Sequence, residues 1–137
     1  MTTYSKFESD FRVRPDDLDM FQHVHNSKYF DYVLAARYDQ MERCYGMSMD
    51  AFLKRGYGWV VQTAHVDYKR PLGLGDYFIV RTGIVTINAK GCRVEFTILN
   101  KATGKVCCDG WFDYVMINLQ TGRGEIVPED VIEKYTV

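Results

Sequence analysis

The feature that most constrains the fold is a change in the spacing of apolar residues near residue 58. Residues 26–45 contain neither Pro nor Gly, and their apolar side chains recur at helical spacing. Beyond Gly56 and Gly58 the spacing falls to every second residue up to Asn118, as in strands. A chain with one long helix and several strands must bury that helix against a sheet.

The long helical segment carries its own boundary signals. We expect Asn26 to be its N-cap and Gly46 to occupy the C′ position. Arg37 interrupts the apolar stripe, and because a buried guanidinium is costly without a partner, we expect it to have a buried or interfacial one. The predicted stripe consists of Phe30, Val33, Leu34, Met41, Cys44 and Tyr45. A shorter helical piece over residues 48–55 is expected to follow.

Five segments have the alternation of strands. They are residues 7–14, 59–68, 76–87, 93–99 and 106–118. Short turns containing Gly or Asn link the last four, which indicates an antiparallel meander, and Pro128 is expected to open a terminal helical turn. The sequence therefore predicts one α+β domain over residues 1–137, with a long helix wrapped by a five-stranded antiparallel sheet. Because one sheet leaves its convex face and edges open, we expect a dimer or larger assembly.

The composition gives no sign of a nucleic-acid or membrane partner. The 137 residues are 47% apolar and carry a formal net charge of −1. No apolar run approaches the roughly 20 residues of a membrane helix, and Met1 to Lys6 lack the apolar region of a secretion signal. The four cysteines form no C-x-x-C pair, so we interpret them as reduced thiols. These features predict a cytoplasmic protein.

The chemistry-bearing residues are concentrated in the loop ahead of the long helix, residues 16–29. This loop holds three carboxylates, two of the three histidines and Asn26. A carboxylate beside a helix N-terminus suits acyl transfer, because Asp19 could serve as nucleophile or base while unpaired N–H groups near His25 to Ser27 stabilise an oxyanion.

Two other interpretations of the loop compete with hydrolysis. Asp17, Asp19, His23 and His25 are residue types that zinc binds, and a His-x-His pair can present both rings to one side. Alternatively, the carboxylates only cap and solubilise the loop while the histidines bond to backbone. The residues alone leave these alternatives open. His65, in the middle of a strand, is expected to be a hydrogen-bonded structural histidine.

The run from Asp19 to Tyr29, D-M-F-Q-H-V-H-N-S-K-Y, resembles a known signature. It is similar to the D-x-x-x-H-V-N-N-x-x-Y motif of small hotdog-fold acyl-CoA thioesterases, the 4-hydroxybenzoyl-CoA thioesterase-like family. The resemblance continues at Ala36-Arg37, at Tyr68-Lys69-Arg70-Pro71 and at Gly75-Asp76. It implies a hotdog fold whose protomers pair into a continuous sheet, with active sites at the dimer interface and further pairing into tetramers in many members.

The resemblance also implies roles for single residues. Asp19 matches the catalytic carboxylate, and Asn26 matches the helix-start residue whose N–H polarises the thioester carbonyl. Arg70 lies where family members often place basic residues near the phosphates of coenzyme A. The substrate-binding region is completed by His23, Val24, His25 and Tyr29, with loop shaping expected of the histidines and packing of Tyr29. No metal or cofactor is implied.

Two departures from the family pattern affect these roles. His25 replaces the first Asn of the motif, so the hydrogen bonding of the loop must differ. Ala35 stands where the family often has Glu, which removes one polar group from the helix.

Asp17, two residues before Asp19, is a second candidate for the working carboxylate.

The resulting hypothesis is a metal-independent acyl-CoA thioesterase. A few of the abundant aromatic residues are expected to line an acyl or aryl pocket. The D-x-x-x-x-N-x-x-H pattern of hotdog hydratases is absent from the sequence. A non-catalytic acyl-CoA or lipid binder and a thioesterase acting on acyl carrier protein remain alternatives.

Overall fold

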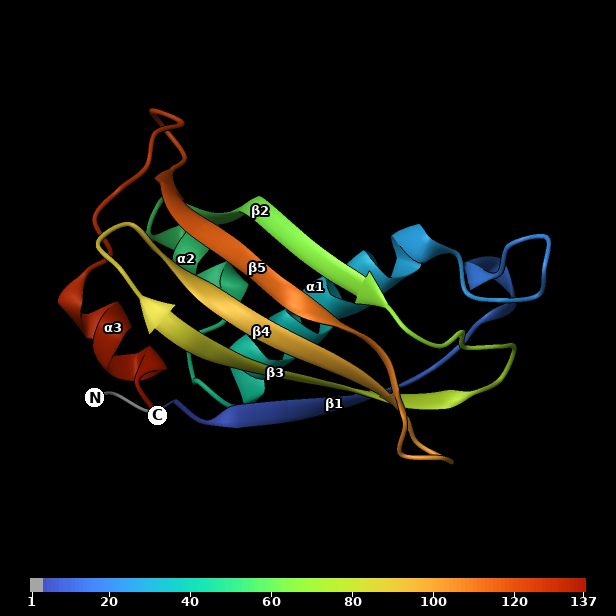
Figure 1. Cartoon of the computed structure of the whole chain (residues 1–137). Helices are drawn as coiled ribbons and strands as arrows, with labels where there is room; N and C mark the ends of the chain where they lie inside the picture. The colour runs from blue at the N-terminus through green and yellow to red at the C-terminus, as the bar shows by residue number, and fades with distance from the viewer. Residues whose placement is uncertain (1–3) are drawn as a thin grey trace.

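One antiparallel sheet of five strands forms the body of the molecule (Figure 1). The computed structural model describes residues 4–137, so part of the N-terminal segment used above to exclude a secretion signal lies outside the described residues. The strands are β1 (Lys6–Arg12), β2 (Tyr57–Tyr68), β3 (Tyr77–Ile87), β4 (Gly91–Asn100) and β5 (Val106–Asn118). All five predicted strands are thus confirmed, with ends displaced by at most two residues.

The order of the strands corrects one prediction. They lie in the order β1-β3-β4-β5-β2, so β3, β4 and β5 form a meander but β2 pairs with β5 instead of β3. The segment 69–76 therefore crosses from one edge of the sheet toward the other (Figure 1). Alternating apolar residues specify which face of a strand is buried but not which strand lies beside it, so the pattern could not reveal this crossing.

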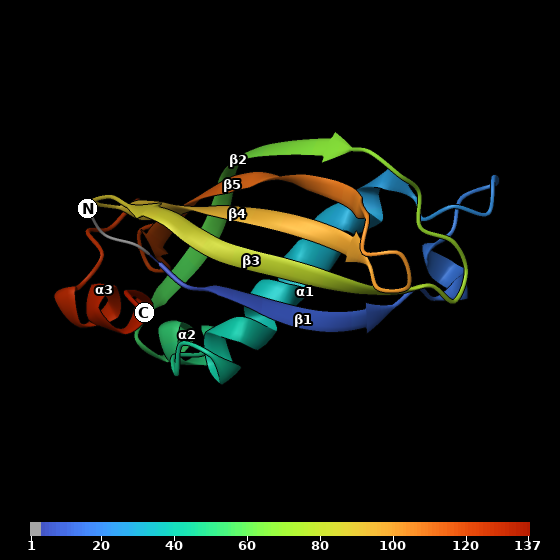
Figure 2. The same ribbon diagram turned by 60° about the horizontal axis from the view of Figure 1, so that its bottom comes forward.

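The long helix α1 (Asn26–Arg43) lies against one face of the curved sheet (Figure 2). The α+β architecture predicted from the sequence, with a central helix and five antiparallel strands, is confirmed. The predicted stripe is wrong at Leu34, which is 37% exposed, because the buried face is centred on Val33 and Ala36. The buried residues of α1 are Tyr29, Tyr32, Val33, Ala36, Arg37, Gln40 and Met41. The helix ends two residues earlier than predicted, with Cys44 as C-cap, so Gly46 lies one residue beyond the predicted C′ position. Gly46 has the left-handed φ of 72° that glycine tolerates best.

A chain of polar side chains, all buried except Asp39, attaches α1 to β1 and β3. Ser9 donates to Asp39 at 2.6 Å and accepts from the Gln40 amide at 3.0 Å. Thr82 donates to the Gln40 carbonyl oxygen and accepts from Arg37 Nη1 at 2.9 Å. Buried polar groups are stable only when they are hydrogen-bonded, so this chain fixes the position of α1 along the sheet.

Two short helices close one end of the domain. They are α2 (Met49–Lys54) and α3 (Glu129–Tyr135), of which the sequence predicted α3 only as a terminal turn. Pro128 is the N-cap of α3 and not its first residue. The Tyr135 hydroxyl donates to the Met47 carbonyl at 2.7 Å, and Arg55 pairs with Asp130 at 2.8 Å. Within residues 4–137, no helix combines the length and the apolar character needed to cross a bilayer.

Candidate active site

Residues 17–25 form a small hairpin immediately ahead of α1. The Asp19 N–H donates to the His23 carbonyl at 2.7 Å, and the His25 N–H donates to the Asp17 carbonyl at 2.8 Å. Leu18 and Val24 form the bridge between these two pairs. The chain reverses at Gln22, which has a φ of 65°. The hairpin therefore holds Asp19, His23, Val24 and His25 in one fixed unit that leads directly to Asn26.

The carboxylate of Asp19 is held by the backbone of its own turn. Its Oδ1 accepts from the N–H of Phe21 at 2.9 Å and from the N–H of His23 at 3.3 Å. Its Oδ2 has no hydrogen-bond partner within residues 4–137, and the residue is partly exposed. One carboxylate oxygen is thus used for positioning, while the other is available for chemistry.

His25 is the N-cap of α1, which corrects the prediction that Asn26 has this role. Its Nδ1 accepts from the Ser27 N–H at 3.1 Å and lies 2.8 Å from the Ser27 hydroxyl. The imidazole Nδ1 lies at a reach from the backbone similar to that of an Asn side-chain oxygen, so it can cap the helix in the same way. Asn26 becomes the first helical residue, and its N–H has no acceptor in the described part of the chain. An unpaired N–H at a helix N-terminus is suited to stabilise negative charge.

The connection between β2 and β3 is hydrogen-bonded to the hairpin and to the first turn of α1. The Val24 N–H donates to the Leu72 carbonyl at 2.8 Å, and the Leu72 N–H donates to the Tyr29 hydroxyl at 3.2 Å. Burial raises the pKa of Tyr29 to about 12. Val24 and Tyr29 are 2% and 3% exposed, so their side chains pack in the core, and a substrate contact by either stays a prediction. At the end of β2, Tyr68 donates to the carbonyl of Asn26 at 3.1 Å.

Asp17, the alternative working carboxylate, is almost completely buried. Its Oδ2 accepts from the Tyr32 hydroxyl at 2.7 Å and from the Arg14 N–H at 3.3 Å. Burial by itself raises the pKa of Asp17, but the hydrogen bonds from Tyr32 and Arg14, with the charge of Arg14, outweigh burial and hold it below its usual value. A carboxylate bonded in this way connects the hairpin to α1. The contact with Tyr32 could not be predicted from the sequence, because it depends on tertiary structure.

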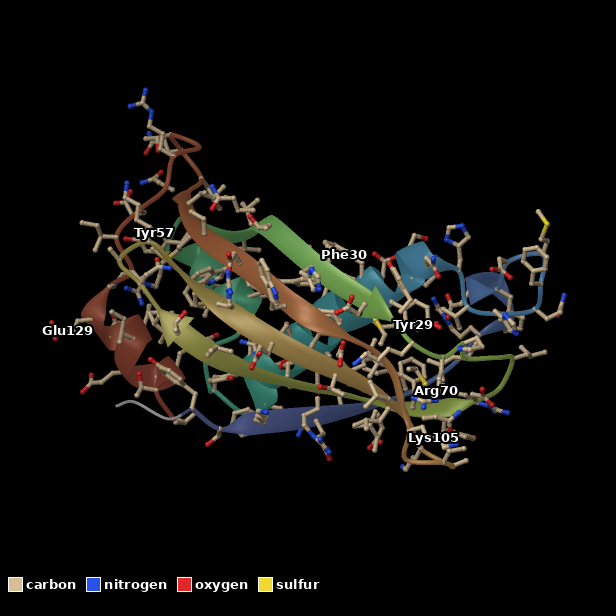
Figure 3. The ribbon with its side chains drawn as sticks, viewed as in Figure 1. Tyr29, Phe30, Tyr57, Arg70, Lys105 and Glu129 are labelled. Carbon is tan, nitrogen blue, oxygen red and sulfur yellow. The ribbon has the colours of Figure 1, made fainter. Side chains whose placement is uncertain are left out.

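Arg70 lies on the same connection but is directed toward β5. Its Nη1 donates to the Val106 carbonyl at 3.0 Å, and its side chain is exposed. Figure 3 shows Arg70 and Lys105 at the end of the molecule where Tyr29 lies, opposite Tyr57 and Glu129. His23 is exposed on the hairpin, and its side chain makes no hydrogen bond to the described residues.

The contacts of His65 and the spacing of possible metal ligands bear on two further predictions. His65 bonds to Asp67 at 3.0 Å and stacks on Trp111, so the predicted hydrogen bond is confirmed, while the structural role stays a prediction. In the region covered by the structure, no cluster of three or more His, Cys, Asp or Glu side chains could hold a metal ion. The alternative of a zinc site in the loop therefore finds no support.

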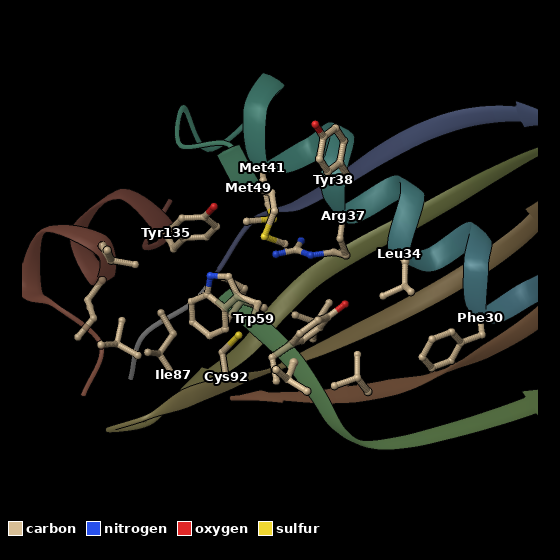
Figure 4. A pocket seen from close by; sticks show the side chains of 18 residues that line it. Phe30, Leu34, Arg37, Tyr38, Met41, Met49, Trp59, Ile87, Cys92 and Tyr135 are labelled. Atoms are coloured by element: carbon tan, nitrogen blue, oxygen red, sulfur yellow. The ribbon is translucent and has the colours of Figure 1, made fainter. Parts of the chain in front are cut away.

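An apolar pocket of about 500 Å³ lies between α1 and the sheet and ends at α3 (Figure 4). Phe30 and Leu34, one and two turns beyond Asn26, form part of its wall on α1. The aromatic residues that line it are Phe30, Tyr38, Trp59, Tyr114 and Tyr135. The sequence indicated that some aromatic residues would line a pocket, but it could not say which, because they come from four separate elements.

The amino-acid sequence matches the thioesterase-like superfamily over residues 13–135, and the chain belongs to this family of thioester hydrolases. It is 26% identical to the long-chain acyl-CoA thioesterase FadM of Escherichia coli (strain K12) over 127 residues, which cover 93% of this chain and 95% of FadM. The membership predicted from the Asp19-to-Tyr29 motif is thereby confirmed.

Solved structures agree with the fold. The DHNA-CoA thioesterase of Staphylococcus aureus superimposes with a TM-score of 0.88 at 20% identity, over 96% of this chain and 88% of that one. The hypothetical protein SAV2348 of the same organism, solved in complex with CoA, gives 0.85 at 20% identity, over 98% and 84% of the two chains. These similarities establish the hotdog fold.

Proposed function

We propose that this protein hydrolyses acyl-CoA thioesters to a free acid and coenzyme A, without a metal ion. Asp19 is the nucleophile or general base, and the N–H of Asn26 polarises the thioester carbonyl. One observation carries this proposal: a single rigid hairpin joins a carboxylate with one unbonded oxygen to a helix N-terminus with an unbonded N–H. These are the two groups that attack on an acyl carbon requires.

Two routes are consistent with this arrangement. In the first, Asp19 Oδ2 removes a proton from water, the water oxygen bonds to the acyl carbon, and the C–S bond breaks. The leaving thiolate then takes the proton from Asp19. In the second, Oδ2 itself bonds to the acyl carbon and expels the thiolate, which takes a proton from solvent, and water hydrolyses the resulting anhydride. In both routes negative charge develops on the carbonyl oxygen beside the Asn26 N–H.

The substrate class is inferred from the relatives and from the pocket. FadM is a long-chain acyl-CoA thioesterase, and the apolar pocket beside α1 has the character that an acyl chain requires. We place the phosphates of coenzyme A near Arg70, because this exposed cation lies on the connection that supports the hairpin. His23 and His25 shape the loop against which the thioester lies.

We also infer that protomers associate into homodimers or homotetramers through β2. This strand of 12 residues lies at an edge of the sheet, and its Val60 and Tyr68 are 44% and 49% exposed. A long exposed edge is stabilised when it pairs with another chain. Sedimentation velocity should give two or four times the 15.9 kDa of one chain, and a single-chain mass would contradict this inference. A cytoplasmic location stays a prediction.

The function is tested by release of free thiol from aliphatic, branched and aryl acyl-CoAs, with acyl carrier protein thioesters in parallel. We expect rapid thiol release from at least one acyl-CoA. Tight binding without thiol release across the whole panel would identify a non-catalytic binder. Hydration of an enoyl-CoA without thiol release would identify a hydratase. Thiol release only from acyl carrier protein thioesters would show that the substrate is carried by acyl carrier protein instead of coenzyme A.

A further inference from the structure

Arg37 brings a buried positive charge to the wall of the apolar pocket. The residue is 7% exposed, and its side chain projects from α1 into the space that Trp59 and Tyr135 border (Figure 4). Its Nη1 donates to Thr82 at 2.9 Å and to the Tyr45 hydroxyl at 3.3 Å. Within the described residues, Arg37 forms no ion pair with a carboxylate, and its Nε and Nη2 donate to no other group. The predicted buried partner is therefore a pair of hydroxyls, together with the Tyr45 ring, whose centroid lies 5.1 Å from the guanidinium carbon.

Two further polar groups of the same pocket are buried without a partner. The Nε1 of Trp59 and the hydroxyl of Tyr114 have no hydrogen-bond partner in the part of the chain that the structure describes. Both residues line the pocket together with Arg37. Burial raises the pKa of Tyr114 to about 12, and the nearby charge of Arg37 opposes this rise. Arg37, Trp59 and Tyr114 thus each bring a donor with unused hydrogen-bonding capacity to the lining of one pocket, and these three residues are called the polar patch.

The chemistry of this patch defines what it could bind. A guanidinium and an indole N–H can only donate hydrogen bonds, and the phenol can donate as well. A buried donor without an acceptor is costly, and so is a buried cation without an anion. A carboxylate supplies both the acceptor oxygens and the negative charge, and it fits the fork of the guanidinium.

The position of Arg37 on α1 sets the length of a matching ligand. Arg37 follows Asn26 by eleven residues, which places it roughly 16 Å further along the helix axis. An extended protein backbone advances roughly 3.5 Å over three bonds, and a carbon chain, whose bonds are slightly longer on average, advances roughly 1.3 Å per carbon, so about 12 carbons span this distance. The pocket borders α1 from Phe30, one turn beyond Asn26, through Leu34 to Arg37.

We propose that the pocket recognises acyl chains of about 12 carbons that carry a carboxylate at the far end, through Arg37, Trp59 and Tyr114. The proposed substrates are thus the CoA thioesters of medium-chain dicarboxylic acids. This inference rests on the proposed function, because the chain length is counted from the proposed thioester site at Asn26. It adds a substrate class and a specificity-determining set of residues.

The test compares two CoA thioethers that cannot be hydrolysed, dodecyl-CoA and its analogue with a carboxylate on the terminal carbon. Calorimetry would measure the Kd of each for the wild-type protein. We expect the carboxylate analogue to bind roughly tenfold more tightly or better. Equal binding, or tighter binding of the plain dodecyl analogue, would overturn the proposal.

Conservative variants attribute the preference to the patch. Tyr114→Phe and Trp59→Phe should each reduce the preference for the carboxylate several-fold. The preference is the ratio of the two Kd values for the same variant, so an effect of the substitution on both ligands cancels. Tyr38→Phe is the matched control, because it removes a hydroxyl from the same pocket that is already bonded to Asp50 at 3.4 Å. Arg37→Met should abolish the preference. If Arg37→Met fails to fold, the two Phe variants still decide, and an unchanged preference in both would contradict the assignment.

Because the thioethers bind without being hydrolysed, the test of the carboxylate site is independent of the test of thioester hydrolysis. Loss of the preference with normal thiol release from dodecanoyl-CoA would reject only the carboxylate site. A clear preference in a protein that releases no thiol would support the site and reject hydrolysis. If hydrolysis holds, kcat/KM should favour dodecanedioyl-CoA over dodecanoyl-CoA.

Discussion

Asp17 and Asp19 are two residues apart, yet the structure gives them different surroundings. Asp17 is buried and bonded to Tyr32 and Arg14, whereas Asp19 is partly exposed and bonded only to the backbone of its own turn. Both carboxylates keep one unbonded oxygen, but Oδ1 of Asp17 is buried, whereas Asp19 is partly exposed. Only a carboxylate that a substrate can reach is well placed to attack it. At the scale of single residues, Asp17 therefore supports the hairpin and Asp19 is the candidate for catalysis.

Asp17→Asn should lower the free energy of unfolding at pH 7 by about 2 kcal/mol, because it removes the charge that Tyr32 and Arg14 stabilise. The folded-state pKa of Asp17 lies below its usual value of 3.8, so this stabilisation is complete above that value. It is lost as the pH falls through the lowered pKa. Urea unfolding at pH 7 and at pH 3 should show the difference from wild type shrinking with acid. Asp16→Asn, at a neighbouring exposed carboxylate, is the control and should have little effect.

The N-cap provides a second prediction at this scale. His25→Ala should destabilise the protein by about 1 kcal/mol, because the Ser27 N–H loses its acceptor. His25→Asn restores the residue of the family motif and should keep stability close to that of wild type. Thermal unfolding of the two variants tests this directly. Equal losses of stability in both would show that the imidazole does not act as a replaceable cap.

At the scale of secondary structure, the close pairing of β2 with β5 determines where β2 delivers the residues that support the site. Tyr68 at the end of β2 reaches the first residue of α1, and the following connection holds the hairpin. On β5, Gly110 pairs with Val66 of β2. A Cβ at Gly110 would lie 1.8 Å from the carbonyl oxygen of His65, so only glycine permits this approach.

Gly110→Ala should therefore separate β2 from β5 and destabilise the protein by more than about 3 kcal/mol. Gly124→Ala is the control, because the nearest atom to its Cβ would be the flexible Lys90 side chain at 3.4 Å. Chemical denaturation of both variants measures the difference. A stable Gly110→Ala protein with normal thiol release would show that this contact does not position the site.

For the molecule as a whole, the features that the sequence predicted are those encoded locally. The helix, the five strands and the candidate catalytic loop each lie within one continuous stretch, and 3.6- and 2-residue spacings report such stretches well. The pairing of β2 with β5 and the bond between Arg37 and Thr82 depend on residues far apart in the chain. The same holds for the pocket, whose walls come from α1, α2, α3 and the strands β2 to β5.

The position of the N-cap shows a smaller limit of the same kind. Asn is a common cap, and an Asn26 cap would make Ser27 the first helical residue. Instead His25 is the cap and the helix begins at Asn26. Helix boundaries depend on which side chain reaches the free N–H groups, and neighbouring residues of similar reach compete for this role. The shift moves Asn26 into the first turn of the helix, where its N–H has no intrahelical acceptor.

The most direct test of the account is thiol release from the best acyl-CoA substrate by wild type, Asp19→Asn and the control Asp16→Asn. Asn at position 19 keeps the oxygen that accepts from Phe21 and His23, so the turn should survive while the charge is lost. Asp19→Asn is expected to lose at least about 100-fold in kcat with unchanged circular dichroism and unfolding, whereas Asp16→Asn should match wild type. If Asp19→Asn turns over substrate at a rate close to that of wild type, Asp19 is not the working carboxylate.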